Sequence, residues 1–479
     1  MIVGSGLSCE FPNMTTTVAV PLWLFILIVL FAAVTFASHF LFPSVRWFLR
    51  RRLEMAVERL NQRLTRPIQP FKLARRTDTI RRLVYDPDVA QAISDYAKET
   101  GVREDVVFQR AERYAREIVP GFSAFTYFTF AIRLARFLSK SLYRVRLTEG
   151  NEQALAAIPP DATVIFVMNH RSNMDYVLVT WLAAERSALA YAVGEWARVW
   201  PLRSLVRALG GYFIRRRYNN PLYRKVLARY VKMATEAGLT QAVFPEGGLS
   251  QTGYLGEPKL GLFSYILEGF EPGVSRDVVF VPIALNYDRV MEDRVLIDAH
   301  AKGTRRFRFS LKPIYRYLRR QIWQRLTGSF RHYGYAAVGF GDPLSLTEFM
   351  ERHENHETQA LGEELMSRIG TVMPITPVPL LCLSLVNGAR NRAALLQGVT
   401  ENVARANALG ASIYLPEEDI AGTVEFGLRT LRERKLLTIS PEGEIDITAE
   451  GQRLAAFYAA SIEHLLPVSP EHRQAPQTS

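Results

Sequence analysis

The sequence predicts an α/β domain with a mainly parallel sheet flanked by helices, set between two largely helical regions. From about residue 160, short β-branched runs alternate with helix-length segments, which is typical of parallel sheets with helical crossovers. An uncharged N-terminal run and two strongly basic stretches frame this domain. With 48% hydrophobic and 22% charged residues among 479, the composition excludes a mostly disordered or collagen-like protein.

The uncharged run covers residues 18–38 and would form about 31 Å of helix at ~1.5 Å per residue, the thickness of a bilayer core. Only Glu10 precedes it as a charge, whereas Arg46, Arg50, Arg51 and Arg52 follow. Basic residues favour the cytoplasmic side of a membrane. We therefore predict a transmembrane helix at 18–42 with the N-terminus outside and the rest of the chain in the cytoplasm.

Charge along the chain is strongly uneven. The total is +12, and the stretches 46–82 and 302–325 each carry +9, so the remainder sums to 12 − 18 = −6. Aromatic and aliphatic residues alternate with arginines after residue 46, a pattern that favours a helix on an anionic leaflet. Residues 122–146, which contain no acid, are either a second such helix or a core helix with solvated arginines. The stretch 302–325 has three interpretations: a patch that faces the leaflet, which we favour, a binding surface for an acidic carrier protein or the phosphates of CoA, or an ordinary solvated surface.

The remaining patterns complete the organisation. Helical spacing continues over 55–145, and strands are predicted at 162–169, 189–193, 211–215, 241–244, 278–287 and 335–340, with helices at 176–186 and 222–238 between them. We predict an N-terminal segment at 1–45, a basic helical membrane-associated region at 46–148, the α/β domain at 149–350, a helical C-terminal region with a β-hairpin at 351–466, and a disordered tail at 467–479.

The C-terminal region has the outline of a winged helix, with helices at 420–435 and 450–466 around a hairpin. Residues 396–466, however, contain six basic and eleven acidic residues. A nucleic-acid-binding domain requires an excess of basic residues. We therefore expect no nucleic-acid partner. Cys9 and Cys382 are far apart, and the eight histidines are scattered, so we predict no metal and no cofactor.

A histidine and an aspartate follow the first strand of the α/β domain. His170 and Asp175 are five residues apart, which on one regular helix would place them ~140° out of register. They meet only if His170 lies in the turn and Asp175 in the first turn of the next helix. The carboxylate then accepts the Nδ1–H and leaves Nε2 as a general base. The alternative is a surface histidine beside an ordinary helix-start aspartate.

Three further segments carry chemistry-bearing residues. One strand ends in Arg215, Arg216 and Arg217, where alternation places Arg216 on the face opposite to the other two; this is either a phosphate-binding fork or a solvated basic end. Another strand enters a loop with Glu246, Gly247, Gly248 and Ser250, where backbone N–H groups can approach a ligand and Glu246 can accept from a hydroxyl. The strand at 278–287 contains Pro282 and forms either the wall of an apolar pocket or ordinary core.

In this order, the four segments resemble the glycerophospholipid acyltransferase family with its HX4D motif, over about residues 150–345. The sequence is most similar to the bacterial membrane-bound glycerol-3-phosphate 1-acyltransferases, since Arg216, Gly247, Gly248 and Lys259 match positions of that subgroup. One departure is that Leu249 and Gln251 stand where the subgroup has arginines. The resemblance implies transfer of a fatty acyl group from acyl-CoA or acyl carrier protein to the sn-1 hydroxyl of glycerol 3-phosphate, giving lysophosphatidate, the first step of phospholipid synthesis.

The resemblance also assigns roles to the site residues. His170 would deprotonate the hydroxyl, Asp175 would orient His170, and Glu246 would position the glycerol. Arg216 and Lys259 would hold the phosphate, and Gly247, Gly248, Ser250 and Pro282 would complete the substrate-binding set. Because the chain has no G-x-S-x-G elbow, direct transfer is favoured over an acyl-enzyme.

The implied location is the bacterial inner membrane, single-pass, with the catalytic domain cytoplasmic and in contact with anionic phospholipid. Two alternatives stay open. One is a lysophosphatidate 2-acyltransferase, which shares the four motifs. The other is an inactive membrane-anchored scaffold that uses its basic surfaces.

Overall fold

The computed structural model describes residues 21–148, 152–183, 188–194, 202–215, 220–303, 332–353, 358–416 and 419–468, together with Arg319, Trp323 and Thr327. The chain divides into two compact units, Met1–Arg63 and Leu64–Ser479. The domain boundaries proposed from the sequence stay a prediction. The predicted tail lies outside the described residues from position 469 onward.

The first unit contains one long helix, α1 (Leu22–Asn61). From Leu22 to Phe31 it presents ten consecutive large apolar side chains that are all exposed. Within the described residues, the structure nevertheless holds no helix with the length and apolar character needed to cross a bilayer. The transmembrane prediction for 18–42 is therefore not confirmed, and residues 18–20 of that span lie outside the described residues.

The centre of the second unit is one mixed sheet, eight-stranded in the described part of the chain. Its strands are β1 (Arg144–Leu147), β2 (Thr163–Met168), β3 (Ala190–Gly194), β4 (Gly211–Ile214), β5 (Gln241–Val243), β6 (Val278–Tyr287), β7 (Tyr335–Phe340) and β8 (Leu344–Ser345). The order is β1-β7-β6-β2-β5-β3-β4, with β8 paired to β6. Only the β6–β7 and β6–β8 pairs are antiparallel, so the predicted α/β class with a mainly parallel sheet is confirmed.

Helices precede, connect and follow these strands. Before the sheet lie α2 (Pro70–Leu73), α3 (Arg76–Val84), α4 (Pro87–Thr100), α5 (Glu104–Ile118), the π-helical turn η1 (Thr126–Ala131) and α6 (Ile132–Leu142). Within the strand region lie α7 (Glu152–Ala156), α8 (Met174–Leu182), α9 (Leu202–Ala208), α10 (Pro221–Glu236), α11 (Gly261–Leu267) and α12 (Asp293–Ala301). After β8 come α14 (Leu346–Arg352), α15 (Thr358–Thr371), α16 (Pro377–Val386), α17 (Arg392–Ala408), α18 (Ile420–Glu433) and α19 (Ala449–Ala459).

Local sequence explains where several helices begin. The side chain of Asp86 accepts from the N–H of Asp88 at 3.1 Å to start α4, and that of Asn220 accepts from the N–H of Tyr223 at 3.0 Å to start α10. In both helices a proline occupies the first position, where no N–H is needed. The start of α10 is thereby fixed directly after the strand β4 and its arginine end.

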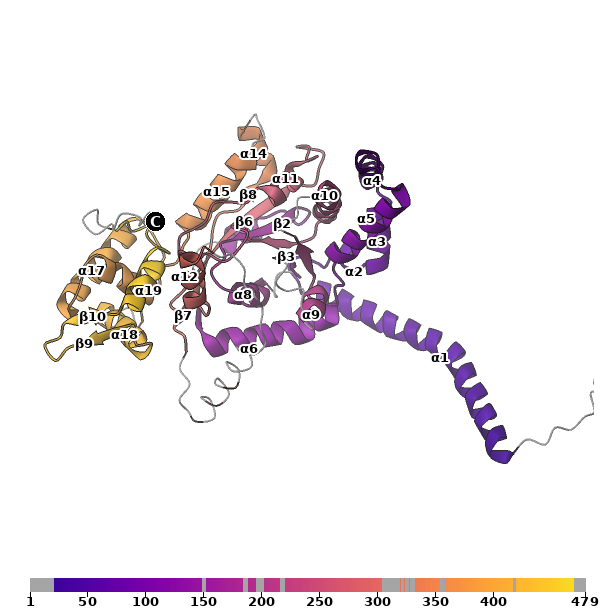
Figure 1. The fold of residues 1–479 in the computed structure, drawn as a ribbon, viewed down its shortest axis with the longest axis horizontal. Coiled ribbons are helices and arrows are strands. Elements are labelled where there is room, and N and C mark those ends of the chain that lie inside the picture. The colour runs from indigo at the N-terminus through magenta and orange to yellow at the C-terminus, as the bar shows by residue number, and fades with distance from the viewer. Residues whose placement is uncertain are drawn as a thin grey trace, which may run out of the picture. The chain divides into compact units, whose positions relative to one another are not determined.

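Two hydrophobic clusters cover the two faces of the sheet. Alternate residues of β2 divide between them: Phe166 and Met168 face α8 and the C-terminal helices, whereas Ile165 and Val167 face α5, α10 and α15. In Figure 1, α10, α11 and α15 lie on one side of the strands and α6 and α8 on the other. The central strands β2, β3, β5 and β6 are therefore buried on both faces, and polar chemistry is confined to their ends.

The C-terminal region contains the predicted helix–hairpin–helix. β9 (Leu437–Ile439) and β10 (Ile445–Ile447) form an antiparallel pair between α18 and α19. The apolar helix α16 is wholly buried from Pro377 to Leu385 and joins the cluster on the α8 face. This region thus packs on the same side of the sheet as the helix that follows His170.

Candidate active site

The turn after β2 is fixed to the neighbouring strand by an asparagine. The side chain of Asn169 accepts from the N–H of Leu285 at 2.7 Å and donates to the carbonyl of the same residue at 2.9 Å. The amide therefore imitates a strand pairing one residue beyond the end of β2. It sets the position from which His170 leaves the sheet.

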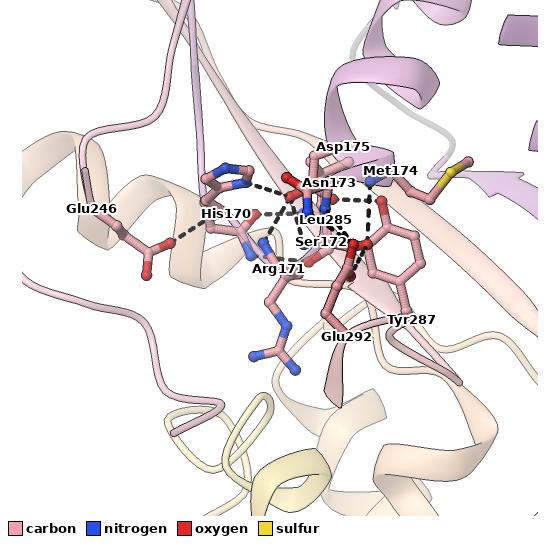
Figure 2. Close-up of polar contacts among 11 residues, drawn as sticks. His170, Arg171, Ser172, Asn173, Met174, Asp175, Glu246, Leu285, Tyr287 and Glu292 are labelled. Carbon is pink, nitrogen blue, oxygen red and sulfur yellow. Dashed lines mark hydrogen bonds and ion pairs between the residues drawn. The ribbon is translucent and has the colours of Figure 1, made fainter. Parts of the chain in front are cut away.

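His170 and Asp175 meet in the geometry predicted from their spacing. His170 lies in the turn, Asp175 in the first turn of α8, and Nδ1 is 2.9 Å from Oδ2 (Figure 2). Oδ2 also accepts from the N–H groups of Arg171 at 2.7 Å and Ser172 at 2.9 Å. With Asp175 fully buried, these donors compensate the ionised carboxylate for the loss of water. The imidazole is held in the Nδ1–H tautomer, with Nε2 available as a base.

Tyr287 contributes the remaining contact of the aspartate. Its hydroxyl, at the end of β6, donates to Oδ1 of Asp175 at 2.6 Å. Burial, together with the charge of Asp175, raises the pKa of Tyr287 well above its ordinary value. The phenol therefore remains a donor, and both carboxylate oxygens are engaged.

Aromatic rings surround the imidazole. The centroid of the His170 ring lies 4.2 Å from that of Phe244 and 5.3 Å from that of Tyr176, and the side chain is 3% exposed. Among the described residues, Nε2 has no hydrogen-bond partner. A hydroxyl that reaches this nitrogen would meet a base held by a carboxylate and shielded from water by aromatic rings.

Glu246 joins the loop after β5 to the histidine. Oε1 accepts from the N–H of His170 at 2.7 Å, and Oε2 accepts from the N–H of Gly256 at 3.0 Å. Burial raises the pKa of Glu246 to about 7, against the opposing effect of these two hydrogen bonds. The loop is also tied to the turn by the N–H of Ser250, which donates to the carbonyl of His170 at 2.9 Å.

The rest of this loop is folded by local contacts. The N–H of Lys259 donates to the carbonyl of Pro245 at 2.7 Å, which places the exposed Lys259 beside Gly247. Gly247 has φ +69°, and a Cβ there would lie 3.0 Å from Cγ of Lys259. The hydroxyl of Ser250 donates to the carbonyl of Tyr254 at 2.8 Å and accepts from the N–H of Gly253, so Ser250 shapes the loop. Gly248 lies in the same loop, half-buried.

Of the three arginines after β4, the structure describes Arg215, and the predicted alternation of their faces stays a prediction. Arg215 forms a bidentate pair with Glu117, through Nε at 2.8 Å and Nη2 at 2.7 Å. Arg216 and Arg217 lie outside the described residues, as does most of the basic stretch 302–325. Pro282 is buried in β6, beside Gly341. Its neighbour Ile283 lines the apolar cavity described below.

Sequence reasoning did not find two contacts around the His170 turn. Tyr287 is 112 residues from Asp175 in sequence, and only the pairing of β6 with β2 brings them together. Glu292 accepts from the hydroxyl of Ser172 at 2.8 Å and from the side-chain amide of Asn173 at 3.0 Å, which fixes the outer part of the turn. The signal for the contact of Tyr287 with Asp175 was a tyrosine at the end of the apolar strand β6, which pairs with β2, the strand before His170.

An apolar cavity of about 90 Å³ lies on the α8 face of the sheet. It is lined mainly by aliphatic and aromatic side chains, among them Phe166 of β2, Val179 of α8, Ile283 of β6 and Phe340 of β7. Two of the elements that line it are β2, which precedes His170, and α8, which carries Asp175. The buried histidine–aspartate pair and the apolar cavity therefore share these two elements.

Comparison with known proteins agrees with this arrangement. Residues 149–286 match the family model described as Acyltransferase, and residues 322–467 match the model described as Glycerol-3-phosphate acyltransferase C-terminal region. The two matches follow one another along the chain, and the resemblance drawn from the four segments is confirmed.

More particular similarity is to bacterial proteins named glycerol-3-phosphate acyltransferase. The protein from Aeromonas hydrophila is 28% identical over 67% of this chain and 41% of its own length, and that from Pseudomonas fluorescens strain SBW25 is 27% identical over 66% and 39%. The matched region thus spans about two fifths of these relatives. A solved structure, the 1-acyl-sn-glycerophosphate acyltransferase PlsC from Thermotoga maritima, matches with 18% identity and a TM-score of 0.28, covering 50% of this chain and 79% of that one.

Proposed function

We propose that the chain transfers a fatty acyl group from an acyl-CoA or acyl carrier protein thioester to the sn-1 hydroxyl of glycerol 3-phosphate. The observation that carries this proposal is the buried pair of His170 and Asp175. Nε2 of His170 has no hydrogen-bond partner among the described residues. Such a pair suits removal of a proton from a hydroxyl. The relatives' names supply the acceptor.

The reaction follows from this geometry. Nε2 of His170 takes the proton of the hydroxyl as its oxygen attacks the thioester carbonyl, and Asp175 stabilises the imidazolium that forms. The tetrahedral intermediate then expels the thiolate, which receives the proton from the imidazolium. The acceptor ends as an ester and the donor as a free thiol, and His170 returns to its neutral form. No step requires a serine nucleophile.

The apolar cavity supports a fatty chain as the transferred group. Nine of its ten lining residues are hydrophobic, and β2 and α8, the two elements that flank His170, contribute to the lining. Burial of acyl methylene groups contributes about 0.8 kcal/mol each. The binding of a chain here would direct its thioester toward the end of β2.

A lipid surface is supported by the segment before the sheet. Around α6, Phe125, Phe130 and Phe137 are 67%, 53% and 58% exposed. The helix also exposes Arg133 and Arg136, and residues 122–146 contain no acid. Exposed aromatic rings next to basic side chains favour an anionic leaflet. This surface supports contact with an anionic membrane, and we propose that the membrane is the bacterial inner membrane, with the catalytic domain on its cytoplasmic side.

The test is an acceptor panel. Isolated membranes containing the full chain receive labelled acyl-CoA or acyl carrier protein with glycerol 3-phosphate, dihydroxyacetone phosphate or lysophosphatidate. The proposal predicts lysophosphatidate from glycerol 3-phosphate. Transfer only to lysophosphatidate would instead assign a 2-acyltransferase. An absence of transfer to every acceptor would leave a membrane-bound scaffold.

A further inference from the structure

Arg171, the residue after the catalytic histidine, has an unsatisfied guanidinium. The residue is 2% exposed, and its Nη1 donates to the carbonyl of Gly253. Its Nε and Nη2 are buried without any hydrogen-bond partner. The guanidinium lies 5.2 Å from the ring centroid of Phe457, on α19. In the part of the chain that the structure describes, no carboxylate forms an ion pair with it.

The two orphaned nitrogens form one edge of the guanidinium. Nε–H and the outer Nη2–H point in the same direction and together bind two oxygens of a carboxylate or phosphate. Arg215 uses this same edge on Glu117, at 2.8 and 2.7 Å. The buried Arg434 also has a partner, since its Nη2 lies 2.6 Å from Asp293. The Nε/Nη2 edge of Arg171 therefore has no hydrogen-bond partner, whereas Arg215 and Arg434 each pair with a carboxylate.

Leaving such an edge buried and empty is costly. A buried donor without a partner loses its hydrogen bonds to water and gains nothing in return, and the cost rises when the group is charged. Burial accordingly lowers the pKa of Arg171, opposed chiefly by the charge of Glu246. An anion that occupied the edge would remove this cost. The arrangement is therefore suited to binding an anion with two acceptor oxygens.

The edge belongs to the residue that directly follows His170. The backbone N–H of Arg171 donates to Asp175 at 2.7 Å, and the carbonyl that anchors Nη1 belongs to the loop that carries Glu246. In Figure 2 the guanidinium points away from the imidazole of His170, toward the C-terminal helices. A ligand on this edge would lie on the side of the turn opposite to the imidazole of His170, although the two residues are adjacent in sequence.

We propose that the Nε/Nη2 edge of Arg171 binds a phosphate group of a substrate. This inference rests on the proposed function, which supplies phosphates from two sources, the acceptor and the CoA donor. Gly253 packs so tightly on α19 that a Cβ there would lie 2.0 Å from the carbonyl oxygen of Phe457. The loop whose carbonyl anchors Nη1 thus contacts α19, so a phosphate held by Arg171 would connect the site to the C-terminal region.

The experiment compares full-length wild type with Arg171→Met and Arg171→Lys. Met keeps the apolar stem without the charge, and Lys keeps the charge without the fork. Arg229→Met is the matched control. Arg229 lies on α10, away from this turn, and its half-buried guanidinium pairs with Asp86 at 2.7 Å. Calorimetric titrations with inorganic phosphate, glycerol 3-phosphate and CoA are combined with KM and kcat for both substrates.

The site predicts that Arg171→Met weakens inorganic phosphate binding at least tenfold, with Arg171→Lys intermediate and Arg229→Met unchanged. A matching rise in KM for glycerol 3-phosphate identifies the acceptor as the source, and one in KM for acyl-CoA identifies the donor. A lower melting temperature in Arg171→Met and Arg171→Lys with unaltered phosphate, glycerol 3-phosphate and CoA binding would overturn the proposal and assign Arg171 to packing alone. Phosphate binding that depends on Arg171 in a protein without acyl transfer would refute the proposed function and leave this site standing.

Discussion

Replacement of Asp175 by asparagine isolates the contribution of its negative charge. Oδ2 accepts three hydrogen bonds, from Nδ1 of His170 and from the N–H groups of Arg171 and Ser172, and Oδ1 faces the hydroxyl of Tyr287. An amide oxygen in the position of Oδ2 preserves all three. The amide nitrogen can then donate to the phenol oxygen of Tyr287. The variant therefore keeps the tautomer and orientation of His170 and loses only the charge.

The magnitude follows from Coulomb's law. Two unit charges about 4 Å apart interact by about 4 kcal/mol at an effective dielectric constant of about 20. Since about 1.36 kcal/mol corresponds to a factor of ten in rate, loss of this stabilisation of the imidazolium lowers kcat by about 10³. Asp175→Ala goes further, because it also leaves the two buried N–H groups without a partner.

The assay is the initial rate of transfer to labelled glycerol 3-phosphate, with kcat and KM determined separately and thermal unfolding as the control for folding. Asp175→Asn should melt close to wild type and lose kcat with little change in KM. If a folded Asp175→Asn protein retained kcat within about tenfold of wild type, charge stabilisation of His170 would not be part of the mechanism.

Four further predictions concern other parts of the molecule. Tyr287→Phe removes a hydrogen bond to a buried carboxylate and should lower the free energy of unfolding by about 1.5–3 kcal/mol in denaturant titrations; an unchanged midpoint would contradict this role. Because the pKa of Glu246 rises from 4.5 to about 7 on folding, its contribution to stability should fall as pH increases across that interval, and Glu246→Gln should lack this slope. Ala183→Phe would fill the apolar cavity and should lower kcat/KM for palmitoyl-CoA relative to octanoyl-CoA; an unaltered ratio would exclude the cavity as the acyl site. Phe130→Ser should weaken binding to anionic liposomes about tenfold, whereas Tyr85→Ser, which alters an aromatic residue 71% exposed elsewhere, should not.

Sequence reasoning succeeded where local pattern decides structure. The short β-branched runs became β2 to β7 because each is buried on both faces, and the five-residue spacing of His170 and Asp175 required one to lie in a turn and the other in a helix. The strand β1 was missed: its four residues include Arg144 and Arg146 and lie at an exposed edge, so the segment lacks the apolar pattern of a central strand.

The remaining contacts depend on tertiary placement. Arg215 meets Glu117 across 98 residues, and no local signal distinguishes this structural pair from a phosphate fork. The orphaned edge of Arg171 becomes visible only when the loop after β5 and α19 are in position. Sequence spacing thus predicted that His170 and Asp175 meet, whereas their further partners could be found only in the folded chain.

The most direct test of the account is acyl transfer from acyl-CoA to labelled glycerol 3-phosphate by wild type and His170→Ala, with the product identified by chromatography and mass spectrometry. The account predicts labelled 1-acyl lysophosphatidate with wild type and a loss of roughly 10² to 10⁴ in kcat with the variant, at an unchanged melting temperature. Wild-type turnover by folded His170→Ala, or no lysophosphatidate from the wild type, would contradict it.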